Sequence, residues 1–295
     1  MKLLIATDLS ENSHRVIETV KARPWPAGTE IRVLHVVDIA PFPLGAELIG
    51  VGEKAAESSI QAIADDLARL GFSTRTEVFP GGPRRAVTEY AKTWRADFIM
   101  VGSQGRTHLA RFLLGGVAQA VVRHASCSVE IVRQAAHRQS VPTEGLRILV
   151  ATDGSECSLA AVRSVAKRPW PKKTSIRLVS AAPPFVPIAD AATSYVYTSQ
   201  SVLAAQAVEE AARRHSEEAL ARAAEVLGEG GVTNVESSGA VTGDPKAVIL
   251  DEAREWSADL IVLGSHGWHG LDRLMMGSVS ESIAMHAHSS VEVIR

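Results

Sequence analysis

The chain has 295 residues, of which 46% are hydrophobic and 22% charged, and its formal net charge is -2. This length suffices for two domains that each bury a core. The near-neutral charge gives no sign of nucleic acid or an anionic membrane as a partner, and two cysteines cannot form a disulfide framework. The N-terminus carries no leader-like stretch and no apolar run reaches membrane-spanning length, so we expect a cytoplasmic protein.

Strand-like and helix-like patterns alternate along the first half. The helical patterns begin near Glu11, where Ser10 or Asn12 would be the N-cap, and continue at 53–70, 83–95 and after Gly115-Gly116. Apolar runs that predict strands buried on both faces lie at 2–7, 31–38, 97–102 and 129–132.

The second half repeats this alternation. The extra residues of this half fall around 183–200, which we expect to be a surface loop before a lengthened helix. Strands are predicted at 147–152, 174–181, 232–239, 259–264 and 290–294, and helices at 156–168, 200–228, 244–257 and 278–288.

Ordered blocks of similar sequence show that the two halves arose by duplication. Leu4-Ile5-Ala6-Thr7-Asp8 returns as Leu149-Val150-Ala151-Thr152-Asp153, and Arg23-Pro24-Trp25-Pro26 returns as Arg168-Pro169-Trp170-Pro171, both at an offset of 145. Further on, Ala96-Asp97-Phe98-Ile99 matches Ala258-Asp259-Leu260-Ile261 at an offset of 162, so the second copy has gained 17 residues. The chain is a tandem repeat of one unit.

Strands that alternate with helices predict the α/β class with a doubly wound parallel sheet. We expect two tandem Rossmann-like domains with five-stranded sheets, at 1–135 and 146–295, joined by a polar linker at 136–145.

The residues that carry chemistry should lie at the carboxyl ends of the strands. In the second copy these are Asp153 after the first strand and the loop Gly264-Ser265-His266-Gly267, followed after nine residues by Gly277-Ser278. Glycines let a backbone approach a phosphate closely, and a helix that begins at Ser278 offers free amides to an anion. Taken alone, the same glycines also fit a purely structural turn.

The complete pattern resembles the universal stress protein family. It consists of Gly-x-x-Gly, nine residues and Gly-Ser after an apolar strand, together with Ala-Thr-Asp-Gly-Ser after the first strand, and the resemblance covers the chain twice. It implies a Rossmann-like unit, of the kind also called adenine nucleotide alpha-hydrolase-like, in which many members bind ATP.

The resemblance also implies a set of binding residues. Asp153, Ala181 and Leu263 would lie at the nucleoside end, and the ribose and phosphates would be held by Gly264, Gly267, Gly277, Ser278, Val279 and Ser280. The matching positions in the first copy are Asp8, Val36, Val101, Gly102, Gly105, Gly115, Gly116 and Val117.

The first copy departs from this pattern at two hydroxyls. Gly116 and Ala118 stand where the second copy has Ser278 and Ser280, and Leu9 replaces the flexible Gly154. A neutral hydrogen bond contributes about 0.5–1.5 kcal/mol, so we expect weaker phosphate binding in the first copy, with the backbone amides retained. ATP should occupy the second site first, and whether Mg²⁺ accompanies it is left open.

Other chemistries have weaker signals. The sequence holds no Walker A string and no serine in a nucleophile turn, and no general base is evident, so any ATP hydrolysis should be slow and no catalytic residue is nominated. His266 and His269 are three residues apart, but no cysteine or carboxylate joins them at ligand spacing, so no metal site is assigned. Arg111 and Arg273 could reach phosphates or simply be exposed.

Assembly and function leave alternatives. In the family the last strand pairs two domains, so Val129–Val132 and Val291–Ile294 should join the copies, and a homodimer of the whole chain is left open. Glu130 and Glu292 interrupt these strands, and we expect them to face solvent, because facing each other they would repel. The first functional hypothesis is an ATP-binding regulatory protein of the stress response; the alternative is an interaction module that needs no nucleotide.

Overall fold

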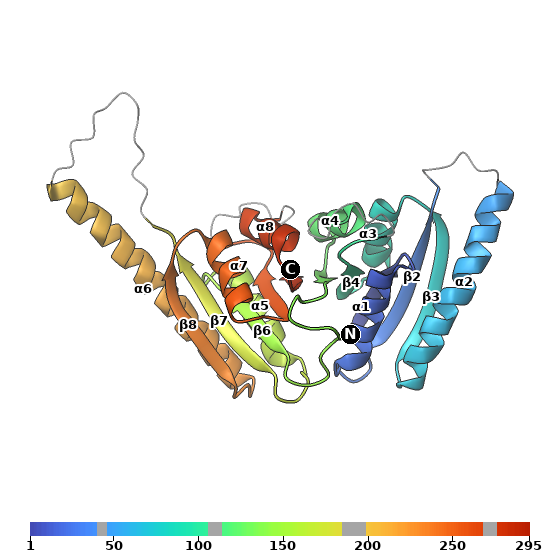
Figure 1. The fold of residues 1–295 in the computed structure, drawn as a ribbon, viewed down its shortest axis with the longest axis horizontal. Helices are drawn as coiled ribbons and strands as arrows, with labels where there is room; N and C mark the ends of the chain where they lie inside the picture. Colours follow the sequence, from blue (N-terminus) through green and yellow to red (C-terminus); the bar gives the residue numbers. More distant parts are fainter. Residues whose placement is uncertain (40–45, 106–113, 185–198, 268–275) are drawn as a thin grey trace, which may run out of the picture.

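The computed structural model describes residues 1–39, 46–105, 114–184, 199–267 and 276–295 (Figure 1). We call residues 1–133 the first copy and residues 146–295 the second copy. The elements of the first copy are β1 Lys2–Thr7, α1 Glu11–Ala22, β2 Glu30–Asp38, α2 Ala46–Arg69, β3 Ser73–Gly81, α3 Pro83–Trp94, β4 Phe98–Gly102, α4 Gly116–His124 and β5 Ser128–Val132. Those of the second copy are β6 Arg147–Ala151, α5 Glu156–Lys167, β7 Ser175–Ala182, α6 Ser199–Glu229, β8 Val235–Thr242, α7 Pro245–Glu255, β9 Leu260–Gly264, α8 Ser278–His286 and β10 Ser290–Ile294.

The strands form one ten-stranded sheet with the order β3-β2-β1-β4-β5-β10-β9-β6-β7-β8. Within each copy all neighbouring strands are parallel, and the chain adds strands first on one side of the initial strand and then on the other. This is the doubly wound arrangement that the alternating pattern predicts, and the fold class is confirmed.

Local sequence signals explain several element ends. Ser10 and Ser155 are the N-caps of α1 and α5. Each side chain accepts a hydrogen bond from the backbone N–H of the residue three positions later, Ser13 or Ser158. After α6, the Val232 N–H donates to the Leu227 carbonyl and so closes the helix. For this reason the strand expected at 232–239 begins only at Val235.

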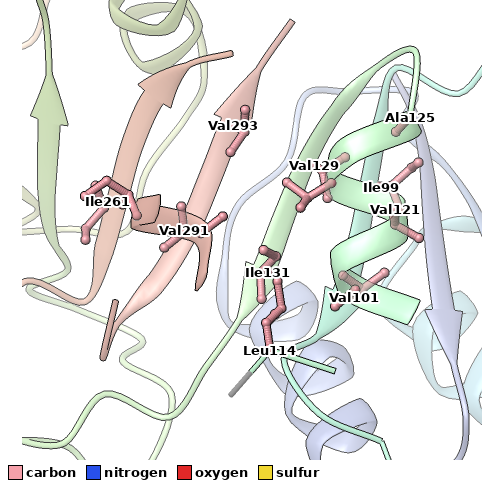
Figure 2. Close-up of a cluster of buried hydrophobic side chains, with 14 of the residues drawn as sticks. Ile99, Val101, Leu114, Val121, Ala125, Val129, Ile131, Ile261, Val291 and Val293 are labelled. Carbon is pink, nitrogen blue, oxygen red and sulfur yellow. The ribbon is translucent and has the colours of Figure 1, made fainter. Parts of the chain in front are cut away.

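The helices cover the two faces of the sheet in different ways. On the face of α3, α4, α7 and α8, a single apolar cluster runs through both copies, and Figure 2 shows part of it, with Val129 and Ile131 beside Val291 and Val293. On the opposite face, α1 and α2 cover one cluster and α5 and α6 cover another. The core is therefore continuous on one face and divided on the other.

β5 and β10 meet as antiparallel neighbours, and the contacts around this seam are reciprocal. The Arg133 N–H donates to Ser290 Oγ, and the Arg295 N–H donates to Ser128 Oγ. The guanidinium of Arg133 donates to the Ala284 carbonyl near the end of α8, and that of Arg295 donates to carbonyls in the last turn of α4. Cations at helix C-termini are favourable, so each copy stabilises the last helix of the other.

The expectation that Glu130 and Glu292 face solvent is wrong. The two residues lie directly opposite each other across the seam, and both side chains are fully buried. Arg23 Nη1 lies 2.7 Å from Glu130 Oε2, and Arg168 Nη2 lies 2.6 Å from Glu292 Oε1. Sequence reasoning missed these ion pairs because the arginines are more than 100 residues away from their partners along the chain.

The linker binds to the second copy through the buried carboxylate of Asp259. This carboxylate accepts hydrogen bonds from Arg138, from His137 and from the N–H of Arg147. None of the described helices combines the length and apolar character needed to cross a membrane.

Candidate functional site

The candidate site lies at the topological switch point of each copy, where successive strands are added on opposite sides of the first strand. In the second copy β6 pairs with β9 on one side and with β7 on the other. The loops after β6 and β9 therefore leave the sheet as neighbours, and the first copy repeats this with β1 and β4. Ligands of open parallel sheets bind in the crevice that such diverging loops create.

The carboxylate after β6 is pressed against the second glycine of the loop after β9. A Cβ added at Gly267 would lie only 2.5 Å from Asp153 Oδ2, closer than any real side chain allows. Asp153 Oδ1 accepts a hydrogen bond from the Ser155 N–H, which fixes the carboxylate at the start of α5. Asp153 and the Gly-x-x-Gly loop, which are more than 100 residues apart, thus form one surface.

The first copy builds the same contact. A Cβ at Gly105 would lie 2.7 Å from Asp8 Oδ2. Asp8 Oδ1 accepts hydrogen bonds from the Ser10 N–H at 3.1 Å and from the Ser13 hydroxyl at 2.5 Å. Both copies therefore hold a carboxylate against a bare backbone at the same place.

The first glycine of each loop has a packing role. A Cβ at Gly264 would lie 2.6 Å from the carbonyl carbon and oxygen of Cys157 in the first turn of α5. The corresponding distance from Gly102 to the Asn12 carbonyl carbon is 3.1 Å. These glycines let the helix after the first strand pack directly on the end of the fourth strand.

The N-terminus of α8 supplies the polar end of the second site. Its N-cap, Gly277, has no side chain to occupy the free amides of the first turn, and the Gly277 N–H donates to the Ser265 carbonyl at 2.8 Å. Ser278 is exposed. Ser280 is only 4% exposed, and its hydroxyl donates to the Gly264 carbonyl at 2.7 Å. Ser278 can therefore meet a ligand, whereas Ser280 ties the helix to the end of β9.

The first copy has the same backbone hydrogen bond at the start of α4, but different side chains. The Gly115 N–H donates to the Ser103 carbonyl at 2.7 Å, and Ala118 is buried without a hydroxyl. A Cβ at Gly116 would lie 2.5 Å from Arg84 Nη2. The guanidinium of Arg84 thus fills the position that a serine side chain would take, so the first site offers a cation in place of two hydroxyls.

The remaining predicted residues have side chains that pack in or against the apolar core. Leu263, Val36 and Val101 are buried in the apolar cluster of the α4 and α8 face. Their side chains therefore belong to the core. Ala181, Val279 and Val117 are half-buried against the same cluster.

The structure adds one residue beside the second site. His215, on α6, places Nε2 3.0 Å from the carbonyl oxygen of Asp153, and its neighbour Ser216 donates to the Ala181 carbonyl. No local motif marks these residues, because only the packing of the lengthened helix brings them to the end of β6 and β7.

Of the two histidines considered for a metal site, the structure describes only His266. His266 Nδ1 lies 2.9 Å from Ser265 Oγ, and burial and the positive charge of Arg295 lower the pKa of its imidazole. Within the described ranges no three histidine, cysteine or carboxylate side chains gather as a metal site would require. His269, Arg111 and Arg273 lie outside the described residues.

Comparison with known proteins identifies the fold and the family. A model of the universal stress protein family matches residues 1–133 and again 146–295. A universal stress protein of Mycolicibacterium smegmatis is 25% identical over 99% of this chain and 96% of its own length, and the Methanocaldococcus jannaschii protein MJ0531 is 30% identical over 45% of this chain and 82% of its own.

A solved universal stress protein from Archaeoglobus fulgidus shares the fold along the whole molecule. It superposes with a TM-score of 0.67 at 24% identity and covers 100% of this chain and 98% of its own. The chain therefore belongs to the universal stress protein family, and it carries two copies of the family's unit in tandem.

Proposed function

We propose that the second copy binds ATP and that the protein acts as a nucleotide-dependent regulator in the response to stress. The phosphates would lie at the start of α8, against the backbone of Gly277 and the hydroxyl of Ser278. The nucleoside would lie toward Asp153 and the end of β7. A carboxylate there accepts hydrogen bonds from neutral hydroxyls, and its charge keeps the phosphates at the other end.

The observation that carries this proposal is the contact between Asp153 and Gly267. It brings the loops after β6 and β9 into contact, and the chain after the second loop continues to α8, whose N-cap Gly277 makes no side-chain cap hydrogen bond. Such a combination favours a ligand with a hydroxyl-bearing end and an anionic end.

We further propose that the two copies respond to the ligand together. α8 begins at the proposed phosphate position and near its end receives the guanidinium of Arg133 from the first copy. A change in the position of α8 would therefore alter contacts across the seam. Binding would regulate conformation, and any hydrolysis of the bound nucleotide would be slow.

The first copy is proposed to bind nucleotide more weakly. Its helix start lacks both hydroxyls, and Arg84 fills the space beside Gly116. An exposed guanidinium can attract phosphate but must be ordered to do so, which costs side-chain entropy.

Mass spectrometry of the purified and denatured protein tests the proposal. We expect ATP, ADP or AMP to be released, and added ATP to raise the melting temperature, with titrations in the presence and absence of Mg²⁺. If no nucleotide is found and ATP causes no thermal shift, the ATP-binding function is wrong and the nucleotide-independent interaction module takes its place.

A further inference from the structure

The seam between the copies differs on its two faces. On the face of α4 and α8 it is apolar and continuous, as Figure 2 shows for Val129, Ile131, Val291 and Val293. On the face of α1 and α5 the apolar clusters of the two copies are separate. Between them lie four charged residues, which we call the seam cluster: Glu130 of β5, Glu292 of β10, Arg23 after α1 and Arg168 after α5.

The seam cluster is buried and symmetric. Both glutamates are fully buried, and the side chains of Arg23 and Arg168 are 6% and 11% exposed. Each arginine follows the first helix of a copy and binds the glutamate of its own copy's last strand. Among the described residues these four are the titratable or charged groups that meet at this point from the two strands and the two segments after α1 and α5.

The hydrogen bonds of the cluster leave one oxygen of each carboxylate without a donor. Glu130 Oε2 and Glu292 Oε1 accept from the arginines, whereas Glu130 Oε1 and Glu292 Oε2 are buried and accept no hydrogen bond within the described part of the chain. An ionised carboxylate is acceptor-only, so two of them cannot satisfy each other. Two buried carboxylates at neighbouring positions also repel, and such pairs commonly keep one proton between them.

The register brings the two carboxyl groups within reach. Glu130 and Glu292 are direct cross-strand partners, and the Cβ atoms of such partners are about 4.5–5.5 Å apart. One added proton would convert one carboxylate into a donor, and a single hydrogen bond would then use both unpartnered oxygens.

We propose that Glu130 and Glu292 share one proton at neutral pH, which forms a hydrogen bond between their carboxyl groups and makes the pairing of the two copies sensitive to pH. The proton comes from solvent when the seam forms and returns to solvent when the seam opens.

Two observations support this distribution of charge. Burial is the largest cause that raises the pKa of Glu292, and the charge of Glu130 raises it further; Arg168 and Arg23 lower this pKa, and the net direction is upward. With one proton bound, two guanidinium groups face one carboxylate. Cation–π contacts compensate part of this excess positive charge. The guanidinium of Arg168 lies 4.7 Å from the ring centre of Trp170 and 5.4 Å from that of Phe98.

The sign of the pH dependence follows. A carboxyl group whose pKa is higher in the folded than in the unfolded state stabilises the fold fully below the unfolded pKa, and this contribution is lost as the pH rises through the folded pKa. The seam should therefore weaken at rising pH, opposite to the usual salt bridge of an aspartate or glutamate.

Glutamine substitutions in the full chain distinguish a shared proton from two ionised pairs. The amide that Glu292→Gln introduces can donate to Glu130 and accept from Arg168, which imitates the protonated state. We expect Glu292→Gln to melt within about 3 °C of the unsubstituted chain and to lose the fall in stability at rising pH. The double variant with Glu130→Gln removes the last negative charge, and its melting temperature should fall by about 6–12 °C.

Infrared difference spectroscopy of the unsubstituted chain against Glu292→Gln gives a second readout. At pH 7 an exposed glutamate is ionised, so a C=O stretching band of a protonated carboxyl identifies the shared proton. Glu281→Gln is the matched control, because Glu281 pairs with Arg123 at the same seam but is partly exposed, and it should change no such band.

The proposal is overturned if the difference between the unsubstituted chain and Glu292→Gln shows no protonated-carboxyl band at pH 7, or if Glu292→Gln destabilises the chain as much as the double variant. Should the variants fail to fold, the band is sought in the unsubstituted chain alone, where its absence at pH 7 gives the same negative answer.

Discussion

Replacing Ser278 and Ser280 separately by alanine tests whether a hydroxyl that meets the ligand can be told apart from one that shapes the loop. The Ser280 hydroxyl is buried and donates to the Gly264 carbonyl at 2.7 Å, whereas Ser278 is exposed at the first position of α8. We expect Ser278→Ala to weaken ATP binding and leave stability unchanged, and Ser280→Ala to do the reverse.

The magnitudes follow from the two environments. A hydrogen bond to a charged phosphate is worth about 1.5–3 kcal/mol, so Ser278→Ala should raise the Kd for ATP about 10- to 150-fold. Removing the Ser280 hydroxyl leaves a buried carbonyl without this donor, at a cost of about 1–3 kcal/mol, and should lower the Tm by about 3–8 °C. Its effect on Kd should stay below about threefold, a difference of about 0.6 kcal/mol.

Isothermal titration calorimetry and thermal unfolding without ligand measure the two effects. The first copy provides an internal reference, because Ala118 occupies the position of Ser280 there and the Gly115 N–H still reaches the Ser103 carbonyl. The reasoning is refuted if Ser278→Ala binds ATP as the unsubstituted chain does, or if Ser280→Ala loses affinity with an unchanged Tm.

Three further substitutions test other parts of the molecule. Gly267→Ala should reduce ATP affinity more than about tenfold, because its Cβ would force the Asp153 carboxylate aside, and an unchanged Kd in calorimetry would place the ligand elsewhere. Gly116→Ser adds the hydroxyl that the first copy lacks, and since the flexible end of Arg84 can turn away, the number of ATP molecules bound per chain should rise toward about two; the same calorimetric stoichiometry as before would contradict this. Asp259→Asn should destabilise the chain by about 1–3 kcal/mol and speed limited proteolysis of the linker, because the buried carboxylate that holds Arg138 is lost, and an equally protected linker would show that other contacts hold it.

The elements that sequence patterns predict best are those buried on both faces. The runs at 2–7 and 97–102 each hold four consecutive apolar residues, and they appear as β1 and β4. β3 carries no comparable signal, because it is an edge strand and each of its residues is partly buried or exposed. For this reason the sequence pattern of the first copy predicts no strand at this position.

The residues of the candidate site also fall into those that the sequence indicates and those that only the structure shows. The glycines and Asp153 stand out because each is fixed by a local turn or a close approach that few residue types allow. His215 and Arg84 do not stand out, because a histidine or arginine on a helix has no local mark, and only the packing of α6 and α3 brings them to the sheet edge. The roles of the predicted binding residues stay predictions until a ligand is measured.

The amino-acid sequence by itself determined the duplication, the α/β class and the position of the glycine loops, because repeats, apolar runs and turn residues are properties of neighbouring positions. Only the tertiary structure decided that Ser280 binds the loop, that Arg84 fills the space beside Gly116, and that Glu130 and Glu292 face each other inside the protein. These outcomes depend on contacts between residues far apart along the chain. Burial of the two glutamates is tolerated because each forms an ion pair with an arginine of its own copy. These arginines lie far away along the chain, so the sequence pattern of the strands does not predict the pairs.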